Sequence, residues 1–198
     1  MLVAVVAIAV ALASTSLVSS SVTVPSPFTA SSPSTPVDRS GNERRGALGE
    51  ADGSIPDGTT VFDDEVPGVA NLDPALLGAL RRAATDAEAD GVEFVVDSGW
   101  RSPAYQARLF REAVSKHGSE HEAARWVATP DTSAHVSGDA VDIGPSAAAA
   151  WLSAHGAVHG LCPIYGNEPW HYELRPEAAD QGCPAMYADP THDPRMQQ

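Results

Sequence analysis

Residues 133–142 read SAHVSGDAVD, and this stretch joins the polar residues of a candidate site to the start of a short strand. The apolar residues that follow the loop predict a strand at 140–143. His135 and Asp142 stand at the two ends of the segment that enters this strand. An Ala-rich helix is expected directly afterwards, over 146–155. The stretch therefore places an imidazole and a carboxylate at the edge of a predicted sheet.

The chain before this stretch carries two clear helix starts, Asp73-Pro74 and Ser102-Pro103. Each pairs an N-cap residue with a proline at the first helical position, which predicts helices from 74 to about 90 and from 103 to about 116. The β-branched run 92–96 between them is typical of a strand.

Further along the chain, 119–127 looks helical and 170–174 is expected to be a strand, because Pro169 disfavours a helix there. Helices come first and strands gather later. We therefore expect the α+β class, as a single compact domain with a small central antiparallel sheet flanked by helices.

Composition divides the 198 residues into four parts. The apolar run within 1–18 is too short for a comfortable bilayer span and has the length of a signal-peptide core, although an N-terminal membrane anchor is the alternative. Residues 19–60 are rich in Ser, Thr and Pro and are expected to be a disordered linker. Eleven of the twelve aromatic residues lie between Phe62 and Tyr187. We therefore predict a folded domain at 61–190 and a tail at 191–198.

The formal net charge of −14 argues against partners that are themselves negatively charged. Nucleic acids and anionic membrane surfaces would both repel such a chain. Two cysteines are too few for a disulfide-dense scaffold or a Cys-rich zinc finger. We expect a monomeric domain that binds no nucleic acid.

Three polar clusters could carry chemistry: 133–142, Glu168-Pro169-Trp170-His171 and Ser98-Gly99-Trp100-Arg101-Ser102. If His171 joins His135 and Asp142, two nitrogens and one oxygen form the ligand set of a catalytic zinc site, which keeps a fourth position for water. Such a site needs a general base, and Glu168 could turn in from a loop because Pro169 interrupts regular pairing. The His135–Asp142 pair alone would be weak support, since that spacing is common by chance.

Taken together and in this order, the clusters resemble the zinc D-alanyl-D-alanine carboxypeptidases and dipeptidases, the VanY- and VanX-like peptidases. The pattern S-x-H-x-x-G-x-A-x-D is met in full by residues 133–142, and E-P-W-H is met by 168–171. The element S-G-[YW]-R-S followed by Gln is met by 98–102 with Gln106. The resemblance covers about 91–174 and implies the compact α+β fold of the Hedgehog and D-Ala-D-Ala peptidase type.

The resemblance also implies roles for individual residues. His135, Asp142 and His171 match the ligands of one zinc ion per chain, Glu168 matches the catalytic base, and Arg101 matches the arginine that stabilises the developing oxyanion. Three further residues are expected to contact substrate: Ser133, Gln106 and Trp170. The implied activity is removal of the terminal D-Ala from peptidoglycan stem peptides by activated water. Glu173 is expected on the strand surface, with a role behind a metal ligand as the alternative.

The cysteines fit export to the outer face of a bacterial membrane, either secreted or anchored. A Cys162–Cys183 bridge would enclose the segment that holds Glu168 and His171, and a loop of that length stabilises by roughly 3 kcal/mol. Two buried free thiols are the alternative.

The sequence leaves three alternative functions open. The hydrolase could instead be an L,D-carboxypeptidase or a peptidoglycan endopeptidase, because bond specificity resides in pocket-shaping loops. Two histidines and a carboxylate also form the facial triad of non-haem iron oxygenases, but that class gives Glu168 and Arg101 no role. A non-catalytic wall-binding module stabilised by a metal is the third reading.

Overall fold

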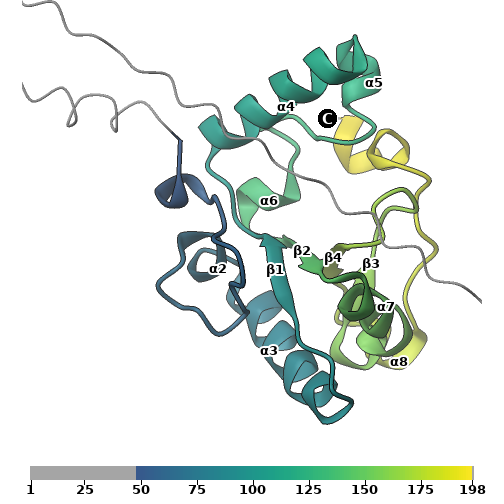
Figure 1. Ribbon diagram of the computed structural model, residues 1–198. Helices are drawn as coiled ribbons and strands as arrows, with labels where there is room; N and C mark the ends of the chain where they lie inside the picture. Colours follow the sequence, from purple (N-terminus) through teal and green to yellow (C-terminus); the bar gives the residue numbers. More distant parts are fainter. Residues whose placement is uncertain (1–47, 198) are drawn as a thin grey trace, which may run out of the picture. The chain divides into compact units, whose positions relative to one another are not determined.

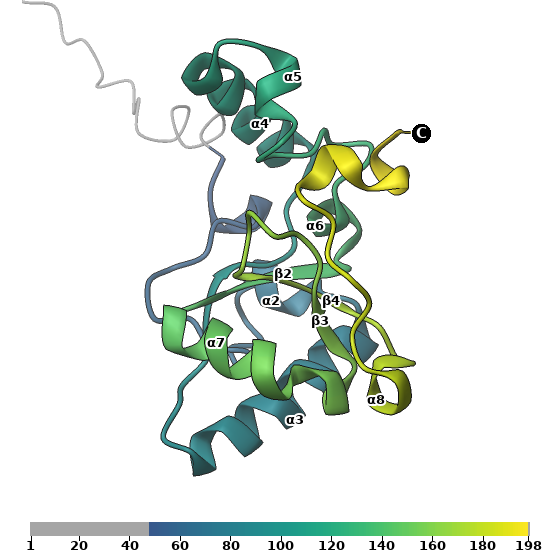
Figure 2. The same cartoon turned by 90° about the vertical axis from the view of Figure 1, so that its right-hand side faces the viewer.

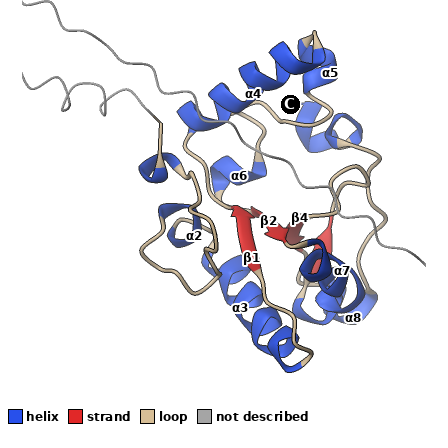
Figure 3. Cartoon of the chain, viewed as in Figure 1, coloured by secondary structure: helices blue, strands red, loops and turns tan. Residues whose placement is uncertain are grey.

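The computed structural model describes residues 48–197, which form an α+β fold around one four-stranded sheet (Figures 1 and 3). The strand order is β1-β2-β4-β3, and every neighbouring pair is antiparallel. The strands are β1 (Val95–Ser98), β2 (Ala140–Gly144), β3 (Leu161–Pro163) and β4 (His171–Leu174). The predicted class, α+β with a small antiparallel sheet, is confirmed.

Helices lie on both sides of this sheet. The α-helices are α2 (Pro67–Ala70), α3 (Pro74–Ala89), α4 (Pro103–His117), α5 (Glu120–Ala123), α6 (Ala134–Ser137), α7 (Ser146–His155) and α8 (Ala178–Gln181). Within residues 48–197 there are also four 3₁₀ turns: η1 (Glu50–Asp52), η2 (Gly156–His159), η3 (Pro190–His192) and η4 (Pro194–Gln197). Both views place α3 and α7 below the sheet, and α4, α5, α6 and the C-terminal turns above it (Figures 1 and 2).

The main hydrophobic core fills the space between the sheet, α3 and α7. Leu76 and Leu80 on α3 are fully buried, as are Val141 and Tyr172 on the central strands. The Tyr172 hydroxyl donates a 2.6 Å hydrogen bond to the carbonyl oxygen of Ala149 on α7, so the buried polar atom is satisfied. This core fixes the position of β2 and β4, which carry the candidate site.

The register of the sheet brings the polar clusters together. Asp142 on β2 lies directly opposite His171 on β4 and opposite Ser98 on β1. The pairing of β1 shifts between Val96 and Ser98, which is an irregularity of the bulge type. Bulges re-aim side chains at the ends of strands, and this one precedes the segment that carries Arg101.

The predicted starts of the two long helices are confirmed. The Asp73 carboxylate accepts hydrogen bonds from the backbone N–H groups of Ala75 and Leu76, and α3 begins at Pro74. The Ser102 hydroxyl accepts from the Tyr105 N–H, and α4 begins at Pro103.

Three elements differ from the prediction. The strand expected at 92–96 runs from Val95 to Ser98, because the Val92 N–H donates to the Ala87 carbonyl and closes α3 instead of pairing in the sheet. The helix expected at 119–127 is the single turn α5, Glu120–Ala123. Strand β3 was not predicted, since three residues that end in proline carry little strand signal.

The folded unit extends further than the boundaries 61–190 in both directions. Ile55 packs against the core, and the Ser102 hydroxyl donates to an Asp52 carboxylate oxygen at 3.0 Å. At the other end, η3 and η4 occupy the expected tail. The expected signal or anchor at 1–18, and most of the linker, lie outside the described residues. Within 48–197, no helix combines the length and apolar character needed to cross a bilayer.

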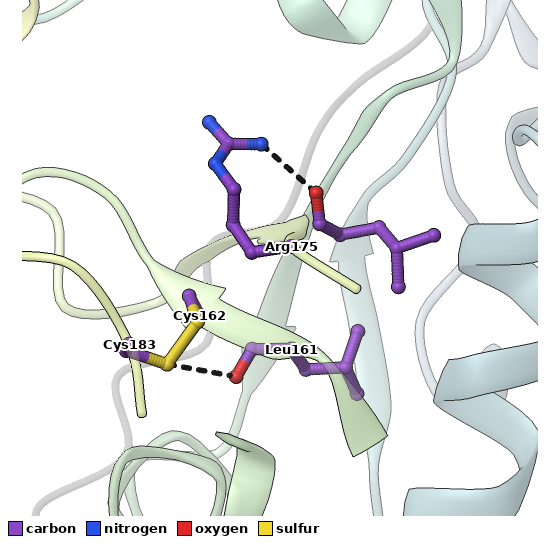
Figure 4. Close-up of a disulfide and its surroundings, with 5 residues drawn as sticks. Leu161, Cys162, Arg175 and Cys183 are labelled. Atoms are coloured by element: carbon purple, nitrogen blue, oxygen red, sulfur yellow. Dashed lines mark hydrogen bonds between the residues drawn. A yellow bond between two sulfur atoms is a disulfide. The ribbon is translucent and has the colours of Figure 1, made fainter. Parts of the chain in front are cut away.

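A disulfide joins β3 to the segment after α8 (Figure 4). Cys162 and Cys183 are 21 positions apart, with their Cα atoms at 5.5 Å. Cys183 Sγ lies 3.6 Å from the carbonyl oxygen of Leu161. The bridge therefore closes a loop around the segment that contains Glu168 and His171.

Candidate functional site

Three buried side chains offer metal-ligating atoms that all lie within 4.8 Å of one another: His135, Asp142 and His171. They come from α6, β2 and β4. His135 Nε2 lies 3.4 Å and His171 Nδ1 lies 3.1 Å from the same carboxylate oxygen, Oδ1 of Asp142. The two imidazole rings are 5.0 Å apart. The sequence-derived trio is thus one cluster in space.

The second ring nitrogen of His135 defines its tautomer. Nδ1 lies 2.8 Å from the carbonyl oxygen of Gly99, an acceptor, so Nδ1 carries the proton and donates it. Burial lowers the pKa of His135, and the neighbouring Arg101 guanidinium lowers it further. The imidazole is therefore neutral at neutral pH, with the lone pair of Nε2 directed at the cluster.

Asp142 is held as a carboxylate. Burial by itself opposes ionisation, but His135, His171 and Arg101 outweigh it and hold the pKa well below the ordinary value. Burial would likewise lower the pKa of His171, yet the hydrogen bond to Asp142 and the nearby Glu173 carboxylate raise it to about 9. The cluster is electrostatically coupled through the single Asp142 side chain.

Glu168 lies at the edge of this cluster. Its Oε2 is 4.0 Å from His171 Nδ1, and the His171 N–H donates to the Glu168 carbonyl at 3.0 Å, which closes the turn before β4. Burial raises the pKa of the Glu168 carboxyl to about 7. Its Oε1 is buried and has no hydrogen-bond partner among residues 48–197. A carboxyl with a pKa near neutrality can exchange a proton with a substrate or a water at that oxygen.

Arg101 reaches the cluster from the loop after β1. Its guanidinium donates to the Ser98 hydroxyl at 2.8 Å, to Gln106 Oε1 at 3.1 Å and to Asp142 Oδ2 at 3.0 Å. A guanidinium has five N–H donors, so donors remain on Nη1 and Nη2 for a further acceptor. Arg101 both fixes Asp142 and presents positive charge to the cavity.

A cavity of about 530 Å³ lies over the cluster. Its walls come from α4, the segment after α5, the start of α6 and the C-terminal turns, and they include Ser133, Gln106 and Trp170. Ser133 is buried, and Trp170 is 41% exposed at the surface. Gln106 is buried with both ends engaged, because its Nε2 donates to the Ala128 carbonyl at 2.8 Å while its Oε1 accepts from Arg101.

Two residues near the cluster, Glu173 and Arg195, lie in surroundings that the sequence did not predict. Glu173 was expected on the strand surface, but it is 1% exposed, and its Oε1 lies 3.5 Å from His171 Nε2. The expectation was wrong because β4 lies between β2 and β3 with its Glu173 face covered by the C-terminal segment. Arg195, which contacts Glu173, was assigned to a tail. A lone arginine among polar residues offers no sequence signal for such a contact.

Known proteins resemble this chain in sequence and in fold. A family model described as VanY, D-alanyl-D-alanine carboxypeptidase, matches residues 70–177, which is more than half of the chain. A curated D-alanyl-D-alanine carboxypeptidase from Enterococcus faecalis is 32% identical over 43% of this chain and 41% of its own length. The chain therefore spans about two fifths of that relative.

Two solved structures share the fold. VanYB in complex with D-alanine-D-alanine is 29% identical, with a TM-score of 0.52 over 56% of this chain and 75% of its own. The LD-carboxypeptidase LdcB is 25% identical, with a TM-score of 0.52 over 65% of this chain and 71% of its own. The region that the family model matches, residues 70–177, contains Arg101, Glu168 and all three residues of the cluster. By sequence and by fold, the chain belongs to the VanY D-alanyl-D-alanine carboxypeptidase family.

Proposed function

We propose that the chain is a zinc-dependent D-alanyl-D-alanine carboxypeptidase that removes the terminal D-Ala of peptidoglycan stem peptides. The observation that carries this proposal is the buried cluster of His135, Asp142 and His171, with a carboxyl of raised pKa, Glu168, beside it. A purely structural metal site has no need of such a carboxyl.

The residues of the cluster fit zinc. Two imidazole nitrogens and one carboxylate oxygen are the ligand set of many catalytic zinc sites, in which a fourth position serves water or substrate. The tautomer of His135 is fixed by Gly99 so that Nε2 is free to ligate. Zinc held there would supply Lewis acidity toward the scissile carbonyl and the attacking water.

The chain supplies the proton transfers and the charge stabilisation. Glu168 would take the proton of the attacking water at its unpartnered Oε1 and return it to the leaving amine of D-Ala. The free N–H donors of Arg101 would donate to the carbonyl oxygen as negative charge develops on it. The cavity of about 530 Å³ has room for the end of a peptide above these groups.

The descriptions of the relatives support the choice of the D,D bond as the bond that is cleaved. The matching family model and the curated relative are both described as D-alanyl-D-alanine carboxypeptidases, which favours the D,D bond. Activity on the L,D bond is the second candidate, because LdcB is described as an LD-carboxypeptidase and its TM-score equals that of VanYB.

We place the enzyme outside the bacterial cytoplasmic membrane, secreted or anchored, where stem peptides are found. The Cys162–Cys183 disulfide supports this location, because such bonds persist in oxidising compartments.

The test is release of free D-Ala by the full chain. A pentapeptide that ends in D-Ala-D-Ala and a tetrapeptide that ends in one D-Ala are incubated with the protein, with and without a chelator, and zinc is then restored. Chelator-sensitive release from the pentapeptide alone is expected. Release from the tetrapeptide alone would replace the D,D assignment with the L,D one. No release from either peptide by zinc-loaded protein would contradict the proposal.

A further inference from the structure

The last part of the described chain runs along the β3 edge of the sheet and ends beside the candidate site (Figure 1). We call residues 186–197 the C-terminal strap; it contains η3 and η4 and lies above the sheet (Figure 2). The Tyr187 N–H donates to the Ile164 carbonyl, and Met196 lines the cavity. The strap lies beyond residue 177, where the match to the family model ends.

Arg195 is the strap residue that binds Glu173, a buried carboxylate of β4, although its own side chain is 41% exposed. Its Nη1 donates to Glu173 Oε2 at 2.7 Å, and its Nη2 donates to Glu173 Oε1 at 3.1 Å. The same guanidinium also binds the buried Asp193 carboxylate, with Nε at 2.9 Å from Oδ2. A fork of this kind fixes both the distance and the plane of the bound carboxylate.

Glu173 in turn faces a proposed metal ligand. Its Oε1 lies 3.5 Å from His171 Nε2, the ring nitrogen that points away from Asp142. This nitrogen is buried and makes no hydrogen bond within residues 48–197, so Glu173 acts on it through charge at ion-pair distance. The side chain of Glu173 is 1% exposed, so its position is set by its protein contacts. Asp193 reinforces the arrangement, because it accepts a 3.0 Å hydrogen bond from Tyr165, whose ring lies 5.2 Å from that of His171.

We propose that Arg195 is a positioning residue, which orients the His171 imidazole for metal binding by clamping Glu173. The inference rests on the proposed function, since it assumes that His171 binds zinc through Nδ1. Partners behind a metal-binding histidine fix its orientation and its basicity, and their removal typically weakens metal binding by about 10- to 100-fold. The strap therefore completes the metal site from outside the family-matched region.

Arg175 provides a matched control. Its Nη2 donates to Glu173 Oε2 at 2.7 Å, so it also neutralises this carboxylate, but it makes no hydrogen bond to Oε1, the oxygen that faces His171. Replacement of either arginine by glutamine removes one positive charge beside Glu173. Only the Arg195 replacement releases the fork.

The experiment measures zinc affinity of the full chain by competition with a chromophoric chelator, at one pH and one salt concentration. Arg195→Gln is expected to weaken binding about 10- to 100-fold and Arg175→Gln by no more than about threefold. The double variant Glu173→Gln/Arg195→Gln is expected to bind no more weakly than Glu173→Gln alone, because the two residues act along one path. If Arg195 only anchored the strap, the loss of zinc affinity in the double variant would instead be the product of the losses in the two single variants.

A second measurement needs no metal. In the metal-free chain, the imidazole nitrogen signals of His171 in NMR spectra are expected to shift in Arg195→Gln and to stay in place in Arg175→Gln. Arg195→Lys retains the positive charge but cannot form the two-pronged contact, and it replaces the glutamine variant if that variant does not fold. Its loss of zinc affinity is expected to lie between that of the wild-type chain and that of Arg195→Gln.

The outcomes separate the two proposals. If the wild-type chain binds no zinc, the proposed function fails and the inference falls with it. If the wild-type chain binds zinc and Arg195→Gln binds it equally well, or if both arginine variants lose the same affinity, the inference alone is overturned.

Discussion

Gln106 holds Arg101 in place: its side-chain oxygen accepts a hydrogen bond from Arg101 Nη1 at 3.1 Å, and its amide nitrogen is tied to the Ala128 carbonyl. The side chain is 1% exposed. Gln106 lies on the cavity wall, as expected of a substrate contact, but both of its polar ends are occupied by the protein. Its main task is therefore to orient the guanidinium.

Gln106→Leu is expected to lower kcat by about 10-fold or more, because a displaced catalytic group loses rate steeply with position. Stability should fall by about 1–3 kcal/mol, since buried polar partners lose their hydrogen bonds. Steady-state kinetics and urea unfolding measure the two effects. Gln181→Leu makes the same chemical change at an exposed position of α8 and should leave both nearly unchanged. A rise in KM with kcat intact would identify Gln106 as a substrate contact instead.

Gly138 is needed at the turn between α6 and β2. Its φ is +82°, and a Cβ there would lie 2.5 Å from the carbonyl oxygen of Asn71. Gly138→Ala should therefore displace both His135 and Asp142. Gly118→Ala is the matched control, because its φ is +86° with nothing within 4 Å.

The left-handed conformation alone costs about 1–2 kcal/mol for a residue with a Cβ, and this cost applies to both glycine variants. Urea unfolding should reveal a clearly larger loss for Gly138→Ala, accompanied by weaker zinc binding. Equal losses and equal zinc affinities would refute the structural role of this glycine.

The disulfide ties the start of the C-terminal segment to β3. Cys162→Ser/Cys183→Ser should lower the free energy of unfolding by about 3 kcal/mol, as expected for a loop of this length. Hydrogen exchange in residues 186–197 should become faster. The wild-type chain treated with a mild reductant provides the comparison without substitution. Unchanged exchange in the strap would mean that its other contacts hold it without the bridge.

The strap also makes stability depend on pH. Burial by itself would raise the pKa of Asp193, but hydrogen bonds from Arg195 and Tyr165 outweigh it and hold the pKa below the ordinary value. In the unfolded chain the pKa of an aspartate is about 3.9, so the contribution of Asp193 to stability is complete above about pH 5. The contribution is lost as the pH falls through the folded-state pKa.

Asp193→Asn should therefore be less stable than the wild-type chain at pH 7, and the difference in stability should narrow as the pH falls below about 4. Urea unfolding at pH 7, 5, 4 and 3.5, followed by tryptophan fluorescence, measures this difference. Asp180→Asn on the exposed face of α8 controls for loss of a carboxylate as such. A difference of constant size across this range would contradict the assignment.

Local signals account for the parts of the fold that the sequence predicted well. A capping side chain followed by proline defines the starts of α3 and α4 through contacts within three residues. The cluster itself was recognisable because its motifs occur in the order of the family. Their approach in space depends on the register that pairs Asp142 with His171, which no local pattern specifies.

The remaining features depend on contacts between distant residues. Arg195 meets Glu173 across 22 positions, and Arg125 meets Asp189 across 64. The strap contains no Leu, Ile, Val or Phe, so its composition resembles that of an unstructured tail. Ion pairs with buried carboxylates hold it in place, and such pairs leave no periodic pattern in the sequence.

Glu168→Gln separates catalysis from metal binding, because it removes the proposed base and leaves all three proposed ligands in place. Zinc content and D-Ala release from the pentapeptide are measured on the same preparations of variant and wild type. We expect one zinc ion per chain in both proteins, and a loss of kcat of at least about 100-fold in the variant alone. A variant that holds zinc and hydrolyses the pentapeptide at the wild-type rate would contradict the proposed role of Glu168.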